Sequence, residues 1–157
     1  NFEKKIQGSK IYNNVSIVDL SSNLAPENSV DAVVTFRNLH NWIGPQMDTI
    51  FQSSYKALKP GGIFGVVEHR ANPGTSLDLM KKSGYVTESY AIAIAEKHGF
   101  VLVDKSEINA NPKDLKNYER GVWTLPPSLR LKDTDKEKYL AIGESDRMTL
   151  LFKKPTP

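Results

Sequence analysis

The fold is decided by the stretch Val30-Asp-Ala-Val-Val-Thr-Phe-Arg-Asn-Leu-His-Asn-Trp42, in which an apolar run passes directly into a polar and aromatic loop. Residues 32–36 are almost all apolar or β-branched, which is typical of a strand buried on both faces of a parallel sheet. The second decisive stretch is Ala57-Leu-Lys-Pro-Gly-Gly-Ile-Phe-Gly-Val-Val67. It predicts the end of a helix, a tight turn and another buried strand at 63–67.

A helix connects these two strands. It begins at Pro45, where the missing N–H costs nothing because the first turn has no partner for it. Apolar residues then recur at helical spacing, at Met47, Ile50, Phe51, Tyr55 and Leu58. A strand, a helix and a strand of these lengths predict a right-handed βαβ unit.

The rest of the chain predicts a single three-layer α/β domain over residues 1–157. The expected elements are a strand at 15–18, a loop at 21–29, a loose polar stretch at 72–84, a helix from 87 to 99, a strand at 100–103, a long polar insertion at 109–136 and a closing strand at 147–152. A long insertion that carries aromatic residues favours a functional role over an accidental one.

Composition excludes several classes of protein. Hydrophobic residues make up 39% and charged residues 25%, as in soluble globular domains. The net charge of +3, from 21 basic and 18 acidic residues, predicts no nucleic-acid partner. Without cysteine there is neither a disulfide framework nor a thiolate metal site. No apolar run is long enough to cross a bilayer, so no membrane is expected. A cytoplasmic location is the default expectation, and export stays open.

Several of these segments together resemble class I S-adenosylmethionine-dependent methyltransferases, and more narrowly a bacterial group of predicted methyltransferases. The resemblance covers most of the chain, and it rests on Val18-Asp-Leu20, Phe36-Arg-Asn-Leu-His-Asn-Trp42, Leu58-Lys-Pro-Gly-Gly62, Glu68-His-Arg70, Asn109-Ala-Asn-Pro112, Trp123-Thr-Leu-Pro-Pro127 and Gly143-Glu-Ser-Asp-Arg147. It implies a Rossmann-like three-layer sandwich whose mostly parallel sheet ends in an antiparallel strand, with S-adenosylmethionine as the cofactor. It also implies cofactor contacts from Asp19, Leu20, Thr35, Phe36, Arg37 and Asn38.

The chain departs from the family at its N-terminal side. The family's first strand with its glycine-rich turn and the second strand with its ribose-binding acid find no match, since Gly8 stands alone. In the family's sheet those strands lie between the strands expected at 15–18 and 32–36. Three explanations remain: an N-terminally truncated portion of a longer protein, a chain that forms a homo-oligomer through exposed sheet edges, or direct pairing of the 15–18 strand with the 32–36 strand.

Polar residues follow both central strands, where ligands bind in open α/β sheets. His40 is the best candidate for a general base, and Asn38 and Trp42 are candidates for substrate binding. Glu68, His69 and Arg70 follow the next strand, and charged groups there need partners. We therefore predict catalytic roles for His40, Glu68 and His69. A metal is discounted, because no third ligand stands at suggestive spacing beside the two imidazoles.

The remaining candidates lie further along the chain. Arg70, Asn109 and Trp123 are predicted to bind substrate, although a structural loop is the simpler interpretation of Asn109. Glu144, Asp146 and Arg147 are interpreted as local ion pairs. The leading functional hypothesis is methyl transfer to a small molecule, impaired in this chain. The alternative is a non-catalytic methyltransferase fold that self-associates.

Overall fold

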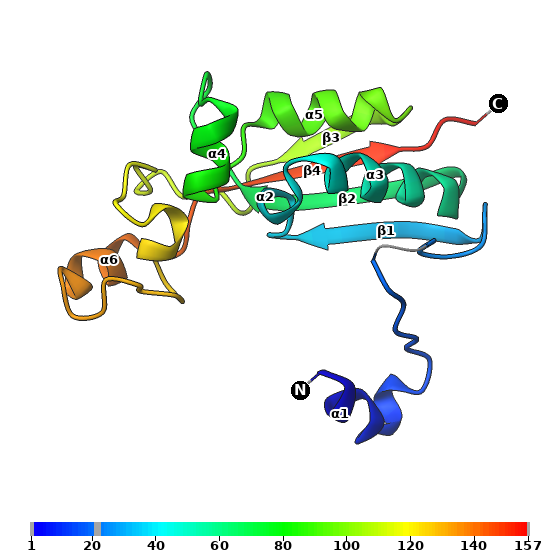
Figure 1. Ribbon diagram of the computed structural model, residues 1–157, viewed down its shortest axis with the longest axis horizontal. Helices are drawn as coiled ribbons and strands as arrows, with labels where there is room; N and C mark the ends of the chain where they lie inside the picture. Colours follow the sequence, from blue (N-terminus) through cyan, green and yellow to red (C-terminus); the bar gives the residue numbers. More distant parts are fainter. Residues whose placement is uncertain (1, 21–22, 157) are drawn as a thin grey trace.

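The computed structural model describes residues 2–20 and 23–156, and the expected loop at 21–29 therefore starts outside the described residues (Figure 1). Its centre is a four-stranded sheet in the order β1-β2-β4-β3. The strands are β1 (Val30–Phe36), β2 (Leu58–His69), β3 (Val101–Ser106) and β4 (Arg147–Lys153). β1 is parallel to β2, whereas β4 runs antiparallel to both of its neighbours, β2 and β3. The predicted Rossmann-like sheet with one antiparallel strand is confirmed.

The βαβ unit places the carboxyl ends of β1 and β2 side by side. Phe36 is in register with Val67, and α2 (Leu39–Trp42) and α3 (Pro45–Ala57) carry the chain from β1 back to the start of β2. β4 begins at the same edge, because Arg147 is paired with His69. The first residues of β4 therefore lie beside the last residues of β2.

Helices cover one face of this sheet. α3 and α5 (Glu88–Lys97) pack onto the even-numbered residues of β2 and β4, and together they form the main core. Core side chains at most 2% exposed include Phe51, Phe64, Val66, Phe100, Met148, Leu150 and Phe152. The Phe64 ring packs edge-on against Phe51 at a centroid distance of 5.1 Å.

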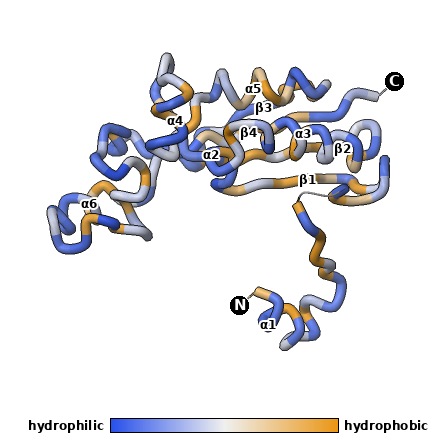
Figure 2. Tube along the Cα trace, viewed as in Figure 1, coloured by the Kyte–Doolittle hydropathy of each residue, from blue (hydrophilic) through white to orange (hydrophobic). Residues whose placement is uncertain are grey.

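The opposite face is open. Val34, Phe36 and Ile63 are 58%, 58% and 40% exposed, and the colours of Figure 2 show apolar residues along β1. The prediction that β1 is buried on both faces is therefore wrong. The run is apolar enough for such an environment, but among the described residues the helices pack on one face only.

The N-terminal arm is not part of the sheet. It contains α1 (Phe2–Gln7) and a 3₁₀ turn (Lys10–Tyr12), and none of residues 2–20 is buried. The strand predicted at 15–18 is wrong, and so is its direct pairing with β1, because β1 pairs with β2 alone in the described part of the chain. An extended segment without a neighbour has no ladder hydrogen bonds to hold it as a strand.

Four helices were missed by the sequence pattern: α1, α2, α4 and α6. α4 (Leu77–Ser83) begins at Ser76, whose side chain accepts a hydrogen bond from Leu79 N, and ends at Gly84, with a left-handed φ of 75°. α6 (Lys136–Ile142) follows the long insertion.

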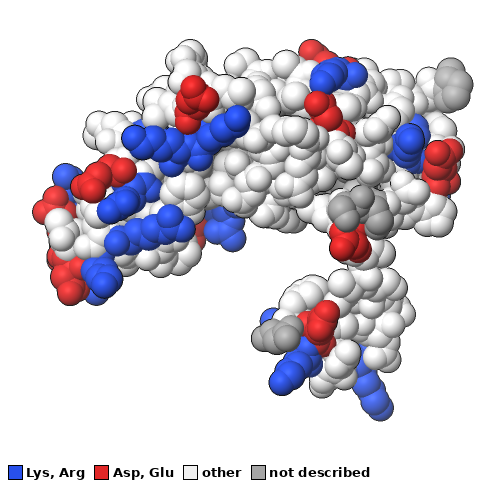
Figure 3. All heavy atoms as spheres, viewed as in Figure 1, with Lys and Arg blue, Asp and Glu red and all other residues white. Residues whose placement is uncertain are grey.

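The insertion is joined to α4 by backbone contact. Its 3₁₀ turn η2 (Gly121–Thr124) approaches α4 so closely that a side chain at Gly121 would collide with the backbone of Ser83. No helix among the described residues is long and apolar enough to span a membrane. On the face shown in Figure 3, acidic and basic side chains are interspersed over the insertion.

Candidate active site

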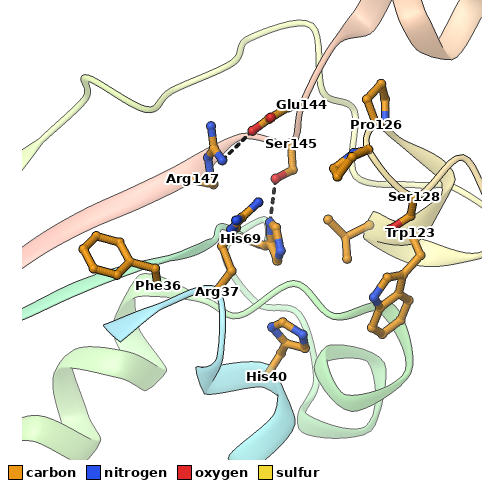
Figure 4. Close-up of a pocket in the computed structure, with 12 residues that line it drawn as sticks. Phe36, Arg37, His40, His69, Trp123, Pro126, Ser128, Glu144, Ser145 and Arg147 are labelled. Atoms are coloured by element: carbon orange, nitrogen blue, oxygen red, sulfur yellow. Dashed lines mark hydrogen bonds and ion pairs between the residues drawn. The ribbon is translucent and has the colours of Figure 1, made fainter. Parts of the chain in front are cut away.

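A cavity of about 240 Å³ opens at the carboxyl ends of β1 and β2 (Figure 4). Its walls come from the loop after β1, the end of β2, the insertion and the start of β4. The lining residues are Phe36, Arg37, His40, His69, Val122, Trp123, Pro126, Pro127, Ser128, Glu144, Ser145 and Arg147. The predicted meeting of the two polar loops at one edge of the sheet is confirmed.

His40 and Glu68 form a hydrogen-bonded pair at this cavity. The His40 ring Nδ1 lies 3.1 Å from Glu68 Oε1, and the His40 backbone N–H donates to Oε2 at 3.1 Å. The Glu68 side chain is fully buried, and its Oε1 also accepts the backbone N–H of His69 at 2.7 Å. A buried carboxylate held by three protein donors fixes the orientation of the imidazole it contacts.

His69 lies beside this pair in a different electrostatic environment. Burial is the main cause that lowers the pKa of His69 to about 4; Glu68 acts in the opposite direction, while His40, Arg37 and Arg147 add to the lowering. His69 is therefore neutral near pH 7. Its Nδ1 lies 2.5 Å from the Ser145 hydroxyl, and its ring centroid is 5.4 Å from that of His40.

The structure also supplies the third ligating group that the sequence spacing did not show. One atom each from His40, Glu68 and His69 lies within 4.8 Å of the others, which brings them near the geometry of a metal site. Both Glu68 oxygens, however, already accept protein hydrogen bonds, and Arg37 and Arg147 place positive charge near His69. The arrangement suits acid–base chemistry better than cation binding.

Several contributors to the cavity were missed as site residues, among them Arg147, Glu144 and Ser145. Arg147 was interpreted only as an ion-pair partner, and its Nη1 does contact Glu144 Oε2 at 2.6 Å, but both residues line the cavity. Ser145 was not considered. The signal was available, because the first residues of an antiparallel strand lie at the carboxyl ends of its parallel neighbours.

A second cavity, of about 410 Å³, runs along the unpaired edge of β1. Leu20, Thr35, Phe36 and Asn38 line it together, as does Trp42, so four of the six predicted cofactor residues meet there. Arg37 faces the first cavity instead, and Asp19 is exposed and does not line either one. The buried hydroxyls of Thr35 and Ser54 have no hydrogen-bond partner among the described residues.

Arg70 and Asn109 lie away from the His40 cavity. The Arg70 guanidinium contacts Asp146, Glu88 and Glu107 at 2.9, 3.0 and 2.6 Å. Burial alone would raise the pKa of Asp146, but hydrogen bonds from Arg70 and Lys116 lower it to about 2. Arg70 is thus held within a network of charges. Asn109 donates to the Thr149 hydroxyl at 2.8 Å and lines a side cavity next to Arg37.

The chain resembles known proteins in sequence and in structure. Residues 2–66 match the family described as "Methyltransferase domain". No curated protein matches the chain. Among solved structures, the [4+2]-cyclase SpnF is 18% identical with a TM-score of 0.62, and the match covers 99% of this chain and 61% of SpnF.

Two further structures are similar over the same extent. A putative sarcosine dimethylglycine methyltransferase from Galdieria sulphuraria is 13% identical with a TM-score of 0.62, over 99% of this chain and 64% of that one. A SAM-dependent methyltransferase from Methanosarcina mazei is 13% identical with a TM-score of 0.61, over 99% and 76%. The chain has the class I methyltransferase fold. This class I methyltransferase-like chain spans less than two thirds of the length of SpnF and of the Galdieria protein.

Proposed function

We propose that the protein transfers a methyl group from S-adenosylmethionine to a small-molecule acceptor, and that the His40 cavity holds the acceptor. The observation that carries this proposal is the His40–Glu68 pair, placed beyond the carboxyl ends of two parallel strands in a methyltransferase fold. A general base is needed there if the acceptor atom must lose a proton before it attacks the methyl group.

The roles of the residues follow from their hydrogen bonds. When His40 Nδ1–H donates to Glu68, the ring Nε2 carries a free lone pair. This nitrogen can then take the proton from the substrate that receives the methyl group. The buried Glu68 carboxylate then stabilises the imidazolium that forms. Trp123, whose ring meets His40 edge-on at 5.9 Å, and the neighbouring prolines narrow the cavity and exclude water.

The cavity along β1 fits part of the cofactor. Leu20, Phe36 and Trp42 offer an apolar slot for a nucleobase, and the unpartnered Thr35 hydroxyl offers a hydrogen bond inside it. When bound, S-adenosylmethionine supplies an activated methyl group on a sulfonium. The described residues include no glycine-rich turn for its carboxylate and ribose. We therefore predict weak or absent cofactor binding by these 157 residues, and micromolar binding in a calorimetric titration would contradict that prediction.

The test of the function is release of S-adenosylhomocysteine with a panel of small phenols and amines, at cofactor concentrations high enough to offset the weak binding expected of these residues. His40→Gln and Glu68→Gln should each lower the rate about 100-fold or more, the usual loss when a general base or its support is removed. His98→Gln is the matched control, since His98 contacts Asp48 at 2.8 Å and does not line the cavity. Equal rates for His40→Gln and the unmodified chain would refute the role of His40.

A second proposal concerns self-association. β1 is paired on one side only, and its apolar face is exposed at Val34 and Phe36. A paired copy would satisfy the free backbone groups of this edge and cover the open face. This proposal does not depend on the acid–base residues. A copy paired along β1 would, however, occupy the edge that the proposed cofactor cavity follows, so a chain paired in this way should be inactive.

A further inference from the structure

Arg37 lies at the rim of the His40 cavity. Among the described residues, its guanidinium makes no ion pair and no side-chain hydrogen bond, whereas its backbone N–H donates to Val67 O at 2.7 Å. Figure 4 shows the Arg37 side chain beside His69. A free guanidinium beside a cavity that already holds a base is available to bind a ligand.

The backbone at Arg37 supports a functional role. Its φ of 58° lies in the left-handed region, which costs a residue with a Cβ about 1 kcal/mol and which glycine or asparagine adopts more easily. Local folding therefore does not favour arginine at this position. A strained residue that directs a charged side chain toward a cavity is better explained by what the side chain contacts there.

Arg147 provides a second set of donors across the same rim. Its Nε is buried and has no hydrogen-bond partner among the described residues, although Nη1 is held by Glu144. Phe36, Arg37, Glu144 and Arg147 line both the His40 cavity and a side cavity of about 320 Å³, so the two spaces meet at this rim. At the rim itself, two guanidinium groups face one carboxylate, which leaves one excess positive charge there, while the buried Glu68 carboxylate is held by His40 and the His69 backbone.

We propose that the methyl acceptor is a monoanion whose carboxylate is bound by Arg37 with help from Arg147. This inference rests on the proposed function, and it adds the substrate class. Arginine donors match the planar geometry of a carboxylate, and the single excess charge suits a monoanion better than a phosphate dianion. Trp123 and Phe36 line the space beside this rim, which favours an aromatic carboxylic acid.

The test is a binding experiment without cofactor. The probe is 4-hydroxybenzoate, and its matched neutral analogue is 4-hydroxybenzamide. Binding is followed by NMR through the indole N–H signal of Trp123, one of two tryptophans in the chain. We expect the benzoate to shift this signal with at least tenfold higher affinity than the amide, and phenyl phosphate to bind more weakly than the benzoate. Equal affinities for acid and amide, tighter binding of phenyl phosphate, or no shift by the benzoate, would overturn the inference.

Two variants should change the affinity for 4-hydroxybenzoate in opposite directions. Arg37→Gln should weaken benzoate binding at least tenfold, and glutamine carries the same backbone cost at this φ. Glu144→Gln should strengthen it, because it frees Arg147 from its acidic partner. Arg120→Gln is the control, since the Arg120 side chain is 63% exposed and does not line the cavity. Unchanged affinity in Arg37→Gln, with an unchanged melting temperature, would refute the role of Arg37.

The two proposals fail separately. Benzoate binding with no methyl transfer to any acceptor would leave the carboxylate site and remove the proposed function. Methyl transfer to neutral acceptors alone would support the proposed function and remove the carboxylate site.

Discussion

The two faces of the sheet differ sharply although they are built from the same strands. Phe64 and Ile63 are neighbours on β2, yet Phe64 is 1% exposed under the helices and Ile63 is 40% exposed on the open face. The covered face owes its burial to α3 and α5, which immediately precede β2 and β3 in the chain. The open face has no such cover, so its apolar residues contribute little to stability and are free to contact other surfaces.

Replacing one residue on each face tests this contrast most strongly. Phe64→Ala should lower the free energy of unfolding by about 3–5 kcal/mol, because it removes a ring that contacts Phe51, Phe100 and Phe152. Ile63→Ala should cost about 1 kcal/mol or less, as for exposed positions. Urea unfolding monitored by circular dichroism measures both. Similar losses would mean that the open face is packed in solution.

The pH dependence of stability tests a place where the insertion and β4 partly cover the open face, at His69. His69 continues the odd-numbered row of β2, but the insertion and β4 bury it partly. Its pKa of about 4 in the folded chain lies below the ordinary value of 6.5, so the unfolded chain binds the proton more readily. Stability present above pH 6.5 should be lost as the pH falls towards 4, by about 3 kcal/mol in all.

The comparison variant for this measurement is His69→Gln. Unfolding free energies at pH 7 and pH 5 should differ less in the variant than in the unmodified chain. The same pH dependence in both would show that His69 is not the group responsible.

The smallest expected effect is on self-association. It compares the two edge strands of the sheet, β1 and β3. Val34 on β1 and Val103 on β3 are 58% and 55% exposed, which makes them a matched pair. Val34→Lys should shift light-scattering mass toward monomer, because a charge on the open edge opposes pairing. Val103→Lys should leave the mass unchanged. A monomeric unmodified chain would remove the basis for edge pairing.

The elements predicted best were those with a strong local pattern. β1, α3 and residues 63–67 of β2 follow from an apolar run, a helical repeat that opens at Pro45, and a second apolar run. The turn predicted at Pro60-Gly61-Gly62 is wrong as a boundary, because β2 already begins at Leu58 and runs through these residues. The strand at 15–18 failed because a strand depends on neighbours that local pattern cannot supply. α4 was missed because it is short and buries one residue, Met80, so it shows no repeated apolar spacing.

The site was predicted in part for the same reason. His40, Glu68 and His69 could be placed together, since carboxyl ends of parallel strands share an edge. The Glu68 hydrogen bonds and the role of Arg147 depend on side-chain geometry and on the antiparallel register of β4, which spacing alone does not give. The charge network of Arg70 likewise joins four separate segments.

The close approach of Gly121 to Ser83 determines how the His40 cavity, the proposed acceptor site, can be altered. Because backbone meets backbone there, even an alanine would push the insertion off α4 and displace Trp123 with it. Attempts to change the size of the cavity should therefore leave that junction intact, including the buried Val122 beside Gly84, and vary Ser128, which lines the cavity. The insertion is fixed to α4 by this backbone contact. A change of side-chain size at a lining position such as Ser128 should therefore alter which ligands fit the cavity, whereas Gly121 should not tolerate replacement.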